Sequence, residues 1–104
     1  MAYNETDIQT EEKTRADHRT QEPPMYRVLL HNDDYTTMAF VVEILMAVFK
    51  RSLEDATRIM LNVHHKGIGV CGTYPYEIAE TKVDTVEMLA RAGGFPLKCS
   101  MERA

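Results

Sequence analysis

The chain has 104 residues, of which 44% are hydrophobic, and carries a formal net charge of −4. This length allows one domain with a modest core. The negative charge gives no electrostatic footprint for nucleic acid or an acidic membrane surface, and no apolar run approaches the roughly 20 residues of a membrane-spanning helix.

The N-terminus lacks the basic and apolar regions of a secretory signal, so we expect a cytoplasmic protein. Residues 1–22 are polar, and their acidic side chains outnumber the basic ones. Such a segment cannot bury enough apolar surface to offset its ordering entropy, so we expect 1–22 to be a disordered acidic arm. Pro23 and Pro24 mark its boundary, and residues 23–104 are predicted to form the core domain.

The core begins with an alternating segment, residues 26–30, that predicts a strand. Apolar residues then recur at helical spacing over 38–49, and the basic residues 50–51 are expected to close this helix. Ser52 is a good N-cap for the next helix, which we expect to stop at Gly67.

The second half of the core repeats the strand and helix patterns. Residues 68–74 predict a short strand in which Gly69 and Gly72 allow close backbone approach. Pro75 suits the first turn of a third helix, and the alternating residues 97–102 predict the last strand. Strand, helix, helix, strand, helix, strand is an α+β order, for which helices covering one face of a small sheet are the natural packing.

The cysteines are Cys71 and Cys99, too few for a disulfide framework or a zinc cluster. We expect both to be buried free thiols.

A polar junction separates the first strand from the first helix. It combines an amide, two carboxylates and two hydroxyls: Asn32, Asp33, Asp34, Thr36 and Thr37. One such residue suffices to cap a helix, and Thr36 is the expected cap. The junction therefore holds more polar groups than a cap requires.

Asp33, Asp34 and His64 are also side-chain types found in metal and acid–base sites. Adjacent carboxylates rarely point the same way, and a calcium loop starting at Asp33 would need glycine where Met38 stands. No Ser or Cys lies in a recognisable nucleophile elbow. We predict no metal site, and a small metal-dependent or acid–base hydrolase built on these residues remains the alternative function.

His64 follows Met60 and Val63 along one edge of the second helix, while Met38 begins the first. With Val41, these residues can form a small apolar pocket rimmed by acids, an amide and an imidazole. The same spacing fits two methionines that fill gaps in the core, and spacing alone favours that interpretation.

Four segments of the core resemble the ClpS family of Clp protease adaptors. The first contains Asn32-Asp33-Asp34-Tyr35-Thr36-x-Met38, and the others fall in 56–67, 79–83 and 96–99. The resemblance implies a three-stranded antiparallel sheet packed against three helices, in the order β-α-α-β-α-β. It also implies a non-enzymatic adaptor without cofactors, which binds N-degrons (N-terminal Leu, Phe, Tyr or Trp) and delivers their proteins to the AAA+ unfoldase ClpA for degradation by ClpP.

The resemblance also assigns site residues. The α-amino group and first peptide units of the N-degron would be held by Asn32, Asp33, Asp34, Thr36 and His64. The first side chain would enter a pocket made by Met38, Val41, Met60, Val63 and Leu97, with Met38 as a gatekeeper against β-branched side chains. Glu77 and Lys82 match positions that dock to the unfoldase. Family members often have proline where this chain has Thr37, so we expect a less rigid start to the first helix.

Overall fold

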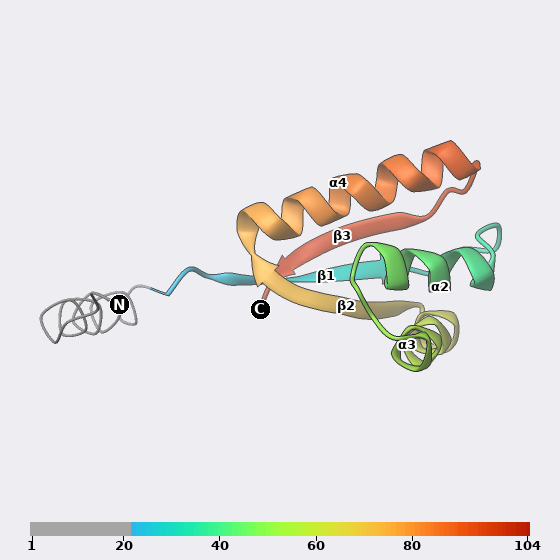
Figure 1. Cartoon of the computed structure of the whole chain (residues 1–104), viewed down its shortest axis with the longest axis horizontal. Helices are drawn as coiled ribbons and strands as arrows, with labels where there is room; N and C mark the ends of the chain where they lie inside the picture. Colours follow the sequence, from blue (N-terminus) through green and yellow to red (C-terminus); the bar gives the residue numbers. More distant parts are fainter. Residues whose placement is uncertain (1–21) are drawn as a thin grey trace, which may run out of the picture.

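A computed structural model describes residues 22–104, so the arm expected at 1–22 lies, apart from Glu22, outside the described residues. Figure 1 shows the predicted order of elements: β1 (Met25–His31), α2 (Met38–Ala47), α3 (Leu53–Lys66), β2 (Ile68–Pro75), α4 (Tyr76–Gly93) and β3 (Lys98–Arg103). The predicted α+β order is confirmed.

The strands form one antiparallel sheet in the order β2-β1-β3, which confirms the predicted sheet and places β1 at its centre. The register of β1 with β2 shifts between Val28, which pairs with Gly72, and Leu29, which pairs with Val70. Cys71 is therefore an extra residue in β2, as in a β-bulge.

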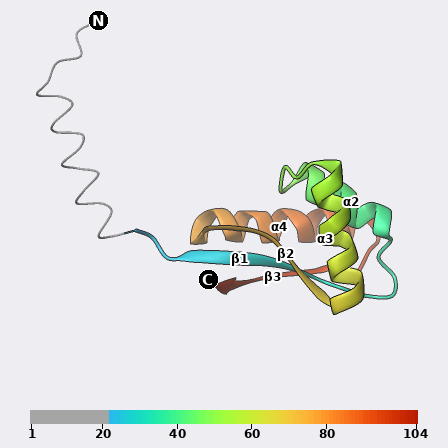
Figure 2. The same ribbon diagram turned by 90° about the horizontal axis from the view of Figure 1, so that it is seen from below.

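The core lies between one face of the sheet and the helices. Val28 and Leu30 of β1 are fully buried there, as is Val86 of α4. Leu29 points to the opposite face of the sheet, yet it is only 7% exposed. The side chains of β1 therefore alternate in direction as expected, but the two faces of the strand differ little in burial. In Figure 2, α4 runs along the sheet, while α2 and α3 gather at the end where β1 leads into the next loop.

Gly69 lets β2 approach α3 closely. A Cβ atom at this position would lie 2.6 Å from Cγ2 of Val63, which is closer than real side chains come. The close backbone approach predicted for this glycine is confirmed, and it fixes how deeply α3 sits against β2.

Local sequence signals end most helices as expected. The Ser52 hydroxyl accepts from the Asp55 N–H at 3.1 Å and caps α3. Gly67 ends α3 with φ of 86°, in the left-handed region that favours glycine. Pro75 lies at the N-cap of α4, immediately before the helix rather than inside it.

The cap of α2 differs from the prediction. Thr37, rather than Thr36, is the N-cap, and its hydroxyl accepts from the Phe40 N–H at 3.1 Å. The Thr36 hydroxyl instead donates to Asp33 at 2.6 Å. Thr37 thus gives α2 a side-chain cap.

The C-terminal end of α2 also differs. The helix ends at Ala47 with Val48 as C-cap, and Lys50 adopts φ of 56° in the turn that follows. The Arg51 guanidinium turns away to the carbonyl of Cys71, at 3.0 and 2.7 Å. The helix therefore ends earlier than predicted and has no basic residue in its last turn, but the Arg51 N–H donates to the carbonyl of Leu45 at 3.1 Å, so residues 50–51 form the turn that closes it.

Both cysteines are free and buried, as predicted. Burial raises the pKa of Cys99 to about 12 and also raises the pKa of Cys71, so both thiols stay protonated near neutral pH. Within residues 22–104, no helix combines the length and apolar character needed to cross a membrane.

The left-handed backbone of Lys50 predicts a stability change. Left-handed conformations cost a non-glycine residue about 1–2 kcal/mol, and glycine avoids most of this cost. We expect Lys50→Gly to have a free energy of unfolding about 1 kcal/mol above that of Lys50→Ala, which removes the same charge but keeps the strain. Urea unfolding of the two variants measures the difference, and an alanine variant of equal or greater stability would contradict it.

Candidate functional site

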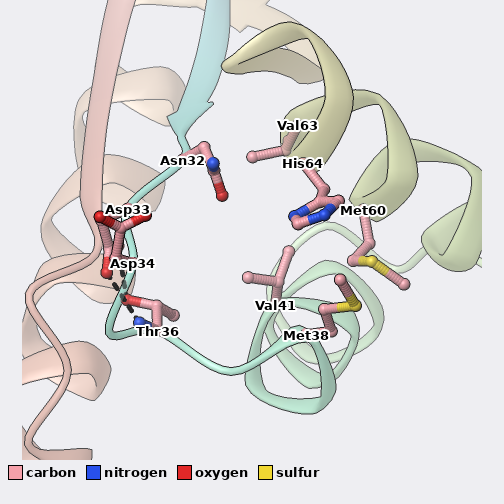
Figure 3. Close-up of a pocket in the computed structure, with 9 residues that line it drawn as sticks. All are labelled: Asn32, Asp33, Asp34, Thr36, Met38, Val41, Met60, Val63 and His64. Carbon is pink, nitrogen blue, oxygen red and sulfur yellow. Dashed lines mark hydrogen bonds between the residues drawn. The ribbon is translucent and has the colours of Figure 1, made fainter.

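A pocket opens between the loop after β1 and the facing sides of α2 and α3, with a volume of about 260 Å³. Figure 3 shows its lining: Asn32, Asp33, Asp34, Thr36, Met38, Val41, Met60, Val63 and His64. The structure thus brings together all the predicted amino-group and pocket residues except Leu97. Leu97 is buried in the core, just before β3.

One end of the pocket is apolar. Met38 and Val41, one turn apart on α2, face Met60 and Val63 of α3. Val41, Met60 and Val63 are buried in the core, whereas Met38 is 45% exposed. Of these four apolar side chains, Met38 is therefore the one at the mouth of the pocket, where it has room to move.

The other end is polar. In Figure 3, Asn32 from the loop and His64 from α3 point into the same space. The Asn32 N–H donates to the carbonyl of Gly67 at 2.9 Å, which ties the loop to the turn after α3. This bond fixes the backbone of Asn32 relative to the helix that carries His64.

The carboxylate of Asp33 makes hydrogen bonds within the loop after β1. One carboxylate oxygen accepts from the N–H groups of Tyr35 and Thr36 at 2.8 and 2.7 Å, and the other accepts from the Thr36 hydroxyl. Partial burial raises the pKa of Asp33, but these three hydrogen bonds outweigh it and bring the pKa below its ordinary value. Asp33 and Thr36 therefore shape the pocket wall by bonding to each other.

Asp34 is exposed and lines the pocket beside Asp33. Within residues 22–104, no side-chain hydrogen bond of the protein engages its carboxylate, so both oxygens can accept from a ligand. In the same part of the chain, no three His, Cys, Asp or Glu side chains come together to hold a metal ion.

The two residues expected to dock to the unfoldase lie on α4, apart from the pocket. Glu77, in the first turn of α4, is exposed. Lys82 instead donates from Nζ to the carbonyl of Val48 at 2.8 Å, and Nζ lies over the rings of Phe49 and Tyr74. Sequence reasoning missed this internal contact, since no local pattern relates residues 34 positions apart.

The sequence predicted the helix end at Gly67 and the close approach at Gly69, but not that both glycines help to form the pocket. Gly67 accepts the hydrogen bond from Asn32, and Gly69 makes room for Val63. The signal was present, because glycines at a helix end and inside a strand mark places where backbone comes close.

These contacts define a small α+β domain with a binding pocket that is apolar at one end and polar at the other. A protein-family model described as "ATP-dependent Clp protease adaptor protein ClpS" matches residues 21–100. The chain is 56% identical over 103 residues to the ATP-dependent Clp protease adapter protein ClpS of Desulforapulum autotrophicum, with 99% of each chain covered. It is 61% identical over 89 residues to the same adapter of Desulfatibacillum aliphaticivorans, with 86% of each covered.

A solved structure, that of Agrobacterium tumefaciens ClpS2 bound to L-phenylalaninamide, is similar with a TM-score of 0.77 and 38% identity. The similarity covers 80% of this chain and 100% of that one. The chain belongs to the ClpS family of adaptor proteins of the ATP-dependent Clp protease. The resemblance stated from the sequence is confirmed.

The hydrogen bonds of Asp33 predict a pH dependence of the loop. Because the folded pKa lies below the unfolded one, the carboxylate stabilises the loop above the ordinary pKa of aspartate. That stabilisation is lost as the pH falls through the lowered pKa. We expect the amide proton shifts of Tyr35 and Thr36, followed by NMR, to titrate below the ordinary aspartate pKa.

Asp34→Asn is the matched control and should leave this titration in place, whereas Asp33→Asn should remove it. A titration that survives in Asp33→Asn would show that another group controls the loop.

Proposed function

We propose that the pocket binds the N-terminal residue of proteins that begin with Leu, Phe, Tyr or Trp, and that the chain delivers these proteins to a ClpA-type unfoldase for degradation by ClpP. The observation that carries the proposal is the joining of an apolar recess to hydrogen-bond acceptors in one pocket. The ligand of the A. tumefaciens relative, L-phenylalaninamide, has an α-amino group and a benzyl group that suit such ends.

The polar end suits an α-ammonium group, which carries three N–H donors and no acceptor. The amide oxygen of Asn32 and an imidazole nitrogen of His64 are acceptors that face the same space, and the carboxylate of Asp34 lines the same pocket. Hydrogen bonds to a charged group contribute roughly 1.5–3 kcal/mol each. In this assignment Asp33 and Thr36 act mainly by holding the loop.

The apolar end suits one unbranched or aromatic side chain. Burying a Leu or Phe side chain contributes roughly 1.5–3 kcal/mol. Once immobilisation costs are subtracted, the affinity is expected to be on the order of micromolar, which allows release to the unfoldase. Leu97 is buried in the core and does not line the pocket, so we expect no direct contact between it and the ligand.

The contacts of Asp33 favour a binding role over the hydrolase alternative. A general base works best with a pKa near the operating pH, whereas the hydrogen bonds within the loop bring the pKa of Asp33 below its ordinary value. For docking to the unfoldase, the exposed Glu77 is the proposed contact on α4.

Acetylation of the peptide tests the polar end. We expect a Leu-initiated peptide to bind and its N-acetylated form to bind at least about 10-fold more weakly, because acetylation removes the charge and two donors. Isothermal titration measures both affinities, with and without a chelator. Equal binding of the two peptides would refute the proposal, and binding that a chelator abolishes would favour the metal-dependent alternative.

Met38 is expected to set selectivity at the mouth of the pocket. A Leu or Phe side chain has one substituent on Cβ and fits past the flexible side chain of Met38. Ile and Val have a second substituent on Cβ, which would clash with it. Discrimination by one such group is roughly 10–200-fold. We expect Met38→Ala to strengthen binding of Ile- and Val-initiated peptides and to change Leu- and Phe-initiated ones little.

A four-peptide affinity panel on the wild type and the variant gives the comparison, and Met46→Ala, which changes a methionine of similar exposure away from the lining, is the control. If the ratio of Leu to Ile affinity is the same in both proteins, Met38 only fills space.

A further inference from the structure

Lys82 connects α4 to the end of α2. Its Nζ donates to the carbonyl of Val48, the C-cap residue of α2, at 2.8 Å. Nζ also lies 5.7 Å from the ring centre of Phe49 and 5.1 Å from that of Tyr74. The side chain is therefore enclosed by a carbonyl and two aromatic rings, which is the environment of an anchored ammonium group.

The end of α2 needs such a cation. The last carbonyls of a helix lack partners within the helix and carry partial negative charge, which basic side chains usually neutralise. The last turn of α2 contains no basic residue. The guanidinium group of Arg51 binds the carbonyl of Cys71 instead. Lys82 supplies from another helix the charge that α2 does not supply itself.

The other end of the same helix forms the pocket. Met38 is the first residue of α2 and Val41 lies one turn later, and both line the cavity. Near this end, Phe40 packs on Phe95 with the ring centres 4.5 Å apart. A helix of ten residues is short and stiff, so a contact that fixes its C-terminal end also restricts the tilt of its first turn.

We propose that Lys82 is a positioning residue of the pocket: by holding the C-terminal end of α2, it sets where Met38 and Val41 stand. This inference rests on the proposed function for its peptide readout. It assigns to Lys82 a role within the domain, distinct from the docking role that the family resemblance implies. A degradation defect in a Lys82 variant could then come from weaker peptide binding or from weaker docking to the unfoldase. Peptide binding can be measured without any unfoldase.

The experiment uses the full chain alone, with Lys82→Met, which keeps the length of the side chain and removes its charge. We expect Leu-initiated peptides to bind roughly 3- to 10-fold more weakly and the ratio of Leu to Ile affinity to fall by a similar factor. Lys82→Arg, which restores a donor and a charge, should recover part of both. Lys98→Met makes the same chemical change at an exposed site on β3 and should alter neither.

Hydrogen exchange gives a readout that needs no peptide. We expect Lys82→Met to lower protection of the α2 amides more than that of the α4 amides. Val86→Ala, which leaves a cavity at the buried face of α4, reports general destabilisation and should lower protection without changing the affinity ratio. If Lys82→Met does not fold, Lys82→Gln takes its place.

Wild-type affinities and an unchanged α2 in Lys82→Met would overturn the inference and leave Lys82 as a docking residue only. Weaker binding with an unchanged ratio, as in Val86→Ala, would also overturn it. If the wild type binds none of the peptides, the proposed function fails, while hydrogen exchange still decides whether Lys82 holds α2.

Discussion

The close packing of β2 on α3 is the constraint on which the site depends. Gly69 leaves no room for a side chain, so Val63 and the helix around it rest directly on the strand. The turn between these elements then meets the loop after β1, where Gly67 accepts from Asn32. The polar end of the pocket is thus fixed by a backbone contact and a backbone hydrogen bond, which vary less than side-chain contacts do.

The two walls of the pocket are held in different ways. The wall made by α3 belongs to the core, with Met60 and Val63 buried against the sheet. The wall made by α2 also packs into the core, through Val41, Ile44 and Leu45, and it has further contacts at its ends, at Phe40 and at the carbonyl of Val48. The exposed residue of the α2 wall is Met38, at 45%, so the part of this wall at the mouth of the pocket can adjust to side chains of different size.

The order of elements and most of the pocket were predictable because their signals are local. The cap at Ser52 depends on neighbours in the chain, and the pocket residues stood out once a family pattern was recognised. The cap at Thr37 was misplaced by one residue because the adjacent threonine offers the same hydroxyl, and only Asp33 decides between them. The contacts of Lys82 and the burial of Leu97 depend on tertiary packing, which no local pattern encodes.

The strand β1 runs from one end of the domain to the loop that forms the pocket. The strand starts at Met25, next to the last residues of β3, and ends at His31, where the loop to the pocket begins (Figure 1). A strand of seven residues is about 20 Å long. A fluorophore or fused domain attached at Glu22 would therefore sit at the pole opposite the pocket, where it can report on assembly without obstructing an incoming chain.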